Sequence, residues 1–406
     1  MAVRNSQRIV RISVPLLLAV VVYAGFSFLI QRLAQPWGSA RADYLAHAAA
    51  AKDWWLGHGL SPPHFLFVGL IIVCHMLFPA MTVSSTAFMA GGIGAVAGAL
   101  ATYAFWIRQL PAQNNGDCWI AALWSLALQV AGPITLATIW ANNFFWGYIY
   151  PASTFHNPTI VLLKPFALLS FALTLRALER SMTGRPGWQL VLGLSAAGIL
   201  SALAKPNWLL CFLPGVVLTV LFDSRLQGRR AAWFVAGAAV LSGLCVLAWQ
   251  YAFLYDQSGA DRIVFTPEKW ISQYGWLAPL KLMLSIAFPV SVLALFWSDL
   301  RKSLLLRLAW ATFGASLLIA YGFSETGSRA GDDNLGWSAQ IALFVLFVAS
   351  AIAMVGAIRQ PATPAKWRAF RLRRDIALAI FLFHLIGGLT CYATYMVDRG
   401  INWAWY

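Results

Sequence analysis

Charged side chains are scarce in this sequence: Asp, Glu, Lys and Arg make up 11% of the 406 residues, against about 25% in soluble domains. Acidic residues are the scarcer kind, with 14 Asp and Glu against 29 Lys and Arg. Hydrophobic residues account for 60% of the chain. This composition excludes a water-soluble fold, and the 14% of aromatic residues excludes intrinsic disorder.

Cysteine is also rare, and the usual catalytic signatures are missing. The five cysteines are widely spaced and form no C-x-x-C pair, so neither a disulfide framework nor a zinc site is indicated. The sequence contains no Walker A motif, no Gly-x-Ser-x-Gly elbow and no His-Glu-x-x-His motif. This argues against ATP-driven work and against those hydrolase and zinc-protease designs. No cofactor is expected.

What the chain does contain is a series of apolar runs of about 20 residues, the length that spans a bilayer core. Each span must be a helix because lipid offers no partner to open backbone groups. The sequence therefore predicts an all-α, polytopic integral membrane protein with about 11–12 transmembrane helices. The runs are 12–31, 64–81, 85–107, 118–140, 159–175, 188–204, 207–222, 232–255, 277–298, 308–323, 337–358 and 376–397.

The chain reads as a single membrane domain, 1–406, in which the basic residues gather between apolar runs. The predicted parts are a first span (12–31), an outer loop with an interfacial helix (32–63), a helical core (64–358), and a basic cytoplasmic loop with the last span (359–406). This scattered basic charge does not form the one soluble face that a nucleic-acid binder needs, so no nucleic-acid partner is expected.

The distribution of Lys and Arg also predicts the orientation. Five clusters hold 18 basic residues against four acids, and the positive-inside rule puts them and the N-terminus in the cytoplasm. Loops 32–63 and 141–158 then both lie outside, yet three runs separate them. We therefore expect that one of the runs 64–81, 85–107 or 118–140 does not cross the membrane fully.

Ionisable residues near membrane depth are functional candidates, and the first pair lies in the first outer loop. Asp43 and His47 are four residues apart and share one face of the predicted interfacial helix. A carboxylate beside an imidazole suits a general base with a proton partner. The alternative is an ordinary solvated face of an amphipathic helix.

Three further polar segments fall on the same predicted outer face. In the first, His156, Asn157 and Lys164 could together hold a phosphate; in the second, Lys205 and Asn207 flank a minimal turn between two runs. The alternative for both lysines is snorkelling to the interface. The third is a polar loop, which is either a binding segment or a solvated turn. Its candidates are Glu325, Arg329 and Asn334, and its Asp332-Asp333 pair is weak evidence for a divalent cation.

A first span followed by an outer loop with an early acid, here the Asp43–His47 segment, resembles the GT-C glycosyltransferases. Residues 155–159 (Phe-His-Asn-Pro-Thr) and the loop 325–337 more narrowly resemble bacterial membrane proteins of polysaccharide loci. The resemblance covers about residues 12–358. The chain departs from the pattern because Asp43 has no acidic neighbour and because it lacks the soluble C-terminal domain that some members carry.

The resemblance implies transfer of a sugar from a polyprenyl-phosphate donor to a glycan, lipid or other acceptor, on the outer face of a bacterial inner membrane. Asp43 would match the family's catalytic base. On chemical grounds alone, Lys164, Lys205 and Arg329 would bind phosphate, with the other candidates above contacting substrate. Two alternatives stay open: a polymerase or ligase of lipid-linked glycans, and a lipid-linked oligosaccharide flippase or other secondary transporter.

Overall fold

The computed structural model describes residues 2–33, 39–58, 65–112, 114–138, 147–149, 157–255, 262–268, 275–327, 330, 334–359 and 364–397. These residues are almost entirely helical, as the sequence predicts. The helices that run along the molecule are α1 (Ala2–Leu33), α4 (Val83–Gln109), α5 (Asn115–Val130), α6 (Pro158–Thr183), α7 (Trp188–Ala204), α8 (Asn207–Phe222), α10 (Arg230–Tyr255), α12 (Ala278–Leu295), α14 (Leu304–Gly322), α15 (Gly336–Ile358) and α16 (Pro364–Val397).

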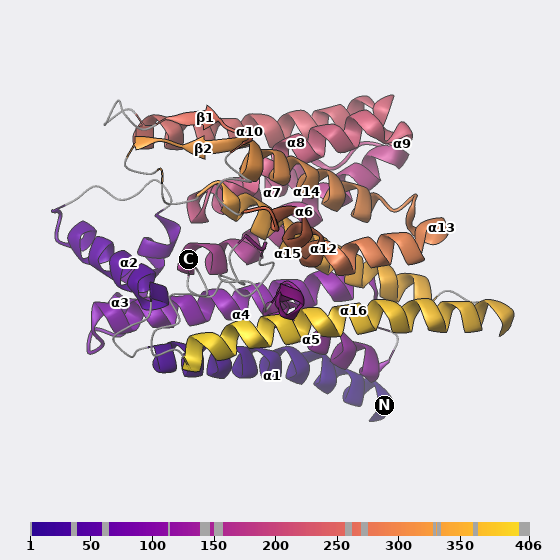
Figure 1. Cartoon of the computed structure of the whole chain (residues 1–406), viewed down its shortest axis with the longest axis horizontal. Coiled ribbons are helices and arrows are strands. Elements are labelled where there is room, and N and C mark those ends of the chain that lie inside the picture. Colours follow the sequence, from indigo (N-terminus) through magenta and orange to yellow (C-terminus); the bar gives the residue numbers. More distant parts are fainter. Residues whose placement is uncertain are drawn as a thin grey trace.

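Shorter elements lie mainly at the two ends of this bundle (Figure 1). They are α2 (Ser39–Trp55), α3 (Leu66–Leu77), the 3₁₀ turn η1 (Thr135–Thr138), α9 (Ser224–Gln227), α13 (Trp297–Leu300), and strands β1 (Ile263–Phe265) and β2 (Phe323–Glu325). We call the end with α2, α3, β1 and β2 the hairpin end, and the end with α9 and α13 the arginine end. β1 and β2 pair antiparallel, with Ile263 opposite Glu325.

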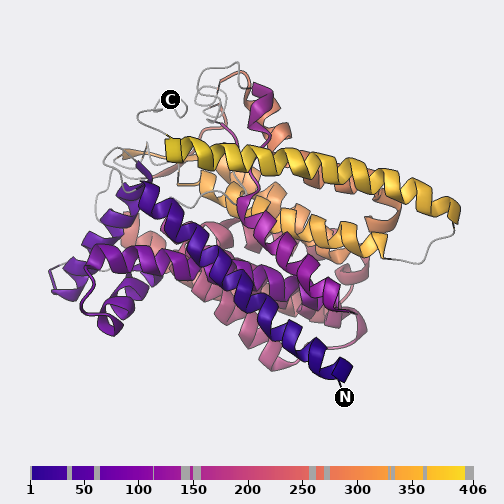
Figure 2. The same cartoon turned by 90° about the horizontal axis from the view of Figure 1, so that it is seen from below.

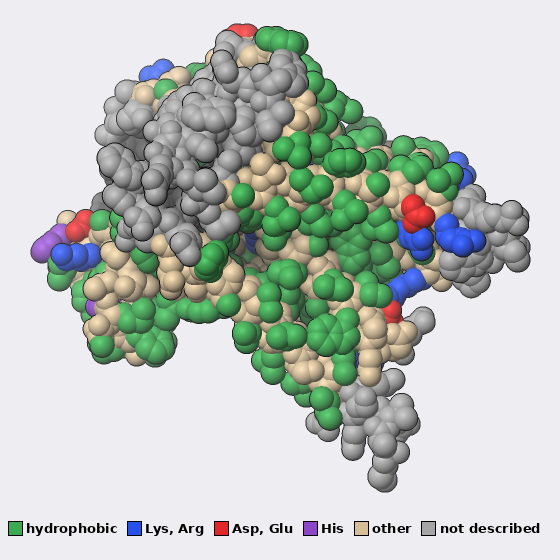
Figure 3. Space-filling model, turned by 60° about the horizontal axis from the view of Figure 1, so that its bottom comes forward, with side chains coloured by type: hydrophobic (Ala, Val, Ile, Leu, Met, Phe, Trp, Pro, Cys, Tyr) green, Lys and Arg blue, Asp and Glu red, His purple; other side chains and the backbone are tan. Residues whose placement is uncertain are grey.

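The helices suit a membrane in length and composition. Among the described residues, nine helices are long and apolar enough to cross one, and α3, α7 and α8 are shorter apolar helices. α15 is the central helix, with 83% of its most apolar window buried, whereas α1 has 22% buried and is peripheral. Figures 1 and 2 show the long helices running lengthwise through the molecule. In Figure 3 hydrophobic side chains cover much of the middle of the visible face, and most of the visible charged side chains lie toward its margins. The chain is a multi-pass membrane protein.

Among the three candidate runs, the first holds the shortest helix, because α3 has only 12 residues. At 1.5 Å per residue it is about 18 Å long, short of a core about 30 Å thick. Helix α4 then runs from the hairpin end to the arginine end, where the charge of its Arg108 acts on Arg176 near the end of α6.

The third candidate run is interrupted, since α5 ends at Val130 and an irregular stretch with Gly132 and Pro133 follows. His384 of α16 satisfies the backbone there: its Nδ1–H donates to the Gly132 carbonyl (2.6 Å), while its own carbonyl accepts from the Gly132 N–H (2.9 Å). The Nε2 atom accepts from the Phe288 N–H of α12 (3.2 Å). The break is therefore closed by protein groups, as membrane depth requires.

Ion pairs tie the helices together at the arginine end. Asp223, which is buried after α8, pairs with Arg225 at 2.6 Å and Arg307 at 3.1 Å. Burial raises the pKa of this carboxyl, but hydrogen bonds from Arg225 and the charges of both arginines outweigh that effect and lower it. Asp117 of α5 pairs with Arg359 after α15. Asp223 and Asp117 thus join helix ends.

Candidate functional site

Lys205 lies where three helices meet at the hairpin end. It precedes Pro206, which disfavours a helical conformation for Lys205, so α7 ends there and Lys205 is extended (φ −166°, ψ 133°). Its side chain is buried, with 8% of the residue exposed. The ammonium group donates to the Thr159 hydroxyl at 3.3 Å and lies 5.0 Å from the ring centroid of Trp337. Lys205 therefore joins the first turns of α6 and α15.

The first turn of α6 is shaped by the Asn157-Pro158 pair. Asn157 caps the helix, its Oδ1 accepting from the Ile160 N–H (3.2 Å) and from the Thr159 hydroxyl (2.7 Å). Pro158 occupies the first helical turn, where its missing N–H is not needed. The cap thus orients the hydroxyl that accepts from Lys205.

Helix α2 is held against the bundle by Tyr44, which is fully buried. Its ring meets Phe26 of α1 and Phe67 of α3 edge-on and packs directly over Gly91 of α4. A Cβ at Gly91 would overlap that ring, so the glycine permits the close approach. This packing fixes the helix that carries Asp43 and His47.

Asp43 and His47 share the electrostatic environment of Lys205. Burial raises the pKa of the Asp43 carboxyl, and the charge of Lys205 opposes this increase. Burial also lowers the pKa of His47 to about 4, and Lys205 adds to the decrease. The imidazole is therefore neutral at pH 7, with its ring 5.4 Å from that of Phe67. The cation of this cluster is Lys205, and Asp43 has the raised pKa that suits a proton acceptor.

A second set of polar contacts adjoins the first through the start of α15. Asn207 Nδ2 donates to the Asn334 carbonyl (2.6 Å) and to the Ser338 hydroxyl (3.1 Å), next to Trp337. Asn334 Nδ2 in turn donates to a Glu325 carboxylate oxygen at 2.8 Å. The β1–β2 pairing holds Glu325 in place. The N-termini of α6, α8 and α15 thus converge here, each with partial positive charge.

The structure brings most of the predicted site residues into this one region. It contains Asp43, His47, Asn157, Lys205, Asn207, Glu325 and Asn334. Lys164 lies in a different environment inside the bundle, where it donates to Gln129 Oε1 (3.4 Å) and lies 5.1 Å from the Phe344 ring centroid. It lines an apolar cavity of about 320 Å³ between α1, α4, α5, α6 and α16. His156 and Arg329 lie outside the described residues.

Sequence reasoning missed two kinds of residue. Trp337 and Thr159, the contacts of Lys205, carry no charge, and nothing in their local sequence marks a long-range partner. Lys281 and His384 could have been found, because each is a single ionisable residue in an apolar run. Lys281 is 1% exposed, with its ammonium group 5.5 Å from the Tyr148 ring centroid.

The described residues offer no set of side chains that could coordinate a metal ion. Among them, no group of three or more His, Cys, Asp or Glu side chains is placed to hold a metal ion. Asp332 and Asp333 lie outside the described residues.

Comparison with known proteins finds a similarity among solved structures. No protein-family model matches the chain, and no curated protein matches it. Among solved structures, it is similar to ArnT from Cupriavidus metallidurans, determined with bound undecaprenyl phosphate. The two share 12% identity with a TM-score of 0.48, over 95% of this chain and 76% of that one.

Proposed function

We propose that this protein is a GT-C-type glycosyltransferase that moves a sugar from a polyprenyl-phosphate donor to a glycan or lipid acceptor. The observation that carries the proposal is the cluster around Lys205. A buried cation, three helix N-termini, a carboxylate with a raised pKa and a neutral imidazole meet at one end of a membrane bundle. This combination offers both an anion site and a base.

Phosphate binding is assigned to Lys205 and the first turns of α6 and α15. A helix N-terminus directs backbone N–H groups toward an anion, and a buried ammonium adds a full charge. When the bond from the sugar to the phosphate breaks, negative charge grows on the phosphate oxygen. Donors that are already in place stabilise that charge without rearranging.

Asp43 is assigned as the general base, with His47 as its proton partner. The acceptor hydroxyl must lose a proton as it attacks the anomeric carbon, and a carboxylate within hydrogen-bond reach can take it. Because His47 is neutral at pH 7, it can donate one hydrogen bond and accept another without competing for the phosphate. The chain from Glu325 through Asn334 to Asn207 supplies further polar groups for sugar hydroxyls.

A transporter fits the same residues less well. Transporters place their polar residues near the bilayer midplane, between related halves. Here the polar cluster lies at the hairpin end and its members come from six separate segments. This distribution favours an enzyme that meets a lipid headgroup at the membrane surface.

Lys205→Gln should weaken the binding of polyprenyl phosphate about 10–100-fold, because a charge-assisted contact contributes about 1.5–3 kcal/mol. The glutamine keeps much of the side-chain length while removing the charge. The measurement is equilibrium binding to the purified protein in nanodiscs, followed by turnover with a sugar-loaded donor. The matched control is Lys302→Gln, an exposed lysine near the arginine end.

Two outcomes would count against this assignment. Unchanged affinity in Lys205→Gln would remove Lys205 from the phosphate site. A loss confined to Lys164→Gln would put the phosphate deeper, beside Gln129 and the apolar cavity.

The same proposal predicts the orientation of the protein. The hairpin end lies on the outer face of a bacterial inner membrane, and the arginine end lies in the cytoplasm. In a cysteine-free background, a membrane-impermeant thiol reagent should label Glu268→Cys and Thr326→Cys in intact cells. It should not label Gln227→Cys or Lys302→Cys until the membrane is opened, since the basic clusters are expected inside. Labelling of the second pair in intact cells would reverse the orientation.

A further inference from the structure

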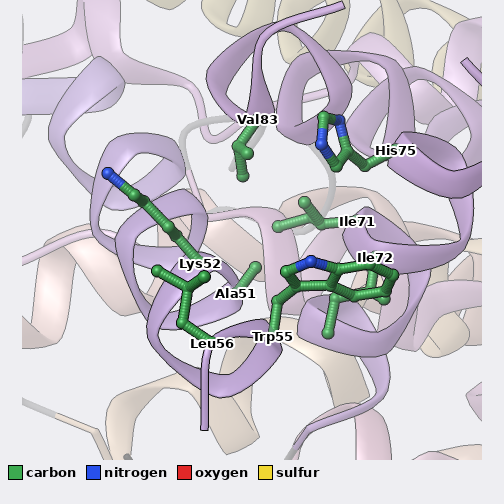
Figure 4. A pocket seen from close by; sticks show the side chains of 8 residues that line it. All are labelled: Ala51, Lys52, Trp55, Leu56, Ile71, Ile72, His75 and Val83. Carbon is green, nitrogen blue, oxygen red and sulfur yellow. The ribbon is translucent and has the colours of Figure 1, made fainter. Parts of the chain in front are cut away.

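A second pocket lies between α2, α3 and the start of α4, apart from the cluster around Lys205. It has a volume of about 190 Å³. Figure 4 shows His75 and Trp55 on one side of the pocket, with Ile71 between them and Lys52 across from them. The rest of the wall is apolar. Its other lining residues are Ala51, Leu56, Ile72 and Val83.

Among its described lining residues, the pocket has polar groups only on Lys52, Trp55 and His75. The Nδ1 atom of His75 is buried and has no hydrogen-bond partner among the described residues. A buried polar atom of this kind is unfavourable unless something supplies a partner. Trp55 is 54% exposed, and Lys52 is exposed beside it. The pocket therefore combines an apolar wall, one unsatisfied nitrogen and a cation at its edge.

We propose that this pocket binds one anionic phospholipid of the surrounding membrane. The phosphate would meet Lys52, the exposed indole of Trp55 would lie at the level of the headgroup, and the upper acyl chain would lie on Leu56 and Ile72. Tryptophan and lysine are the side chains that occupy the headgroup level of a bilayer, and lysine there attracts anionic lipid. Among the described residues, its wall holds no carboxylate or amide to recognise a free sugar.

Occupancy of this pocket bears on the candidate site through α2. Asp43 and Lys52 lie on the same helix, nine residues and about two and a half turns apart. A lipid held between α2 and α3 would fix α2 at the membrane surface. The lipid is thus a positioning ligand for the helix that carries Asp43 and His47.

The test is native mass spectrometry of the delipidated protein with dioctanoyl-phosphatidylglycerol, dioctanoyl-phosphatidylcholine and inorganic phosphate as separate probes. The wild type should bind one phosphatidylglycerol most tightly. Lys52→Gln should bind it about fivefold more weakly, as expected for one lysine at a lipid surface. Val83→Phe, which fills the pocket from α4, should abolish this binding. Lys302→Gln, the control at the other end, should leave it unchanged.

Unchanged phosphatidylglycerol affinity in Lys52→Gln would overturn the proposal, because this exposed substitution leaves the fold intact. Equal binding of inorganic phosphate would overturn it as well, since the pocket would then be a plain anion site. The melting temperature of Val83→Phe shows whether that variant is folded. No sugar donor enters the experiment, so its result does not depend on the proposed glycosyl transfer.

Discussion

Turnover of the purified Asp43→Asn variant should fall about 10²–10⁴-fold, which is roughly 3–5 kcal/mol of barrier. Asparagine has the same shape and still forms hydrogen bonds, but it cannot accept a proton at neutral pH. Burial raises the pKa of Asp43, which strengthens it as a base relative to an exposed aspartate. Donor binding should change far less, since the phosphate contacts are assigned to Lys205.

The control for this experiment lies on the same helix. Asp53 is exposed in the last turn of α2, so Asp53→Asn removes an equal charge from α2 without touching the cluster. A structural role for Asp43 would give the opposite pattern, with Asn tolerated and Asp43→Ala lowering the melting temperature. Near-normal turnover of Asp43→Asn would exclude it as the base and would direct attention to Glu325.

Gly388→Ala should lower the free energy of unfolding by about 3 kcal/mol or more, at the upper end of overpacking effects. In α16, a Cβ at Gly388 would overlap the Val130 carbonyl oxygen, and one at Gly387 would overlap the Pro133 carbonyl oxygen. Both obstacles are backbone carbonyls, one at the last residue of α5 and one in the irregular stretch after it, so neither can rotate away. The measurement is the melting temperature followed by fluorescence-detected size exclusion in detergent.

Gly314→Ala is the matched control. Gly314 lies inside α14, and a Cβ there meets nothing within 4 Å. Alanine is the better helix former by about 0.5–1 kcal/mol, so this variant should be slightly more stable than the wild type. Equal melting temperatures for the two variants would show that α16 does not approach the break as closely as described.

Much of the fold could be predicted because hydrophobic runs and helix breakers are local signals. The runs 188–204 and 207–222 coincide with α7 and α8, since the Lys205-Pro206 turn separates them. The run 64–81 was less well predicted. Helix α3 ends at Leu77, just before Pro79, and this proline was a readable signal for the end of the helix. Hydropathy alone gave no means of choosing among the three candidate runs.

The candidate site was predictable only in its local part. The four-residue spacing of Asp43 and His47 and the minimal turn at Lys205 are visible in the sequence. The contacts of Lys205 with Trp337 and of Asn207 with Ser338 join residues more than 120 positions apart, and no local pattern encodes them. Lys164 illustrates the reverse case: its position in the sequence suggested the surface cluster, but its side chain enters the bundle.

The irregular stretch after α5 depends on a helix that is synthesised much later, α16. Its hydrogen bonds to His384 connect residues 252 positions apart, so the partner that closes the break is synthesised long after the break itself. Until α16 inserts, the carbonyl and N–H of Gly132 lack the groups that pair them in the finished protein. The packing around the end of α5 is therefore completed only after α16 has been synthesised and inserted.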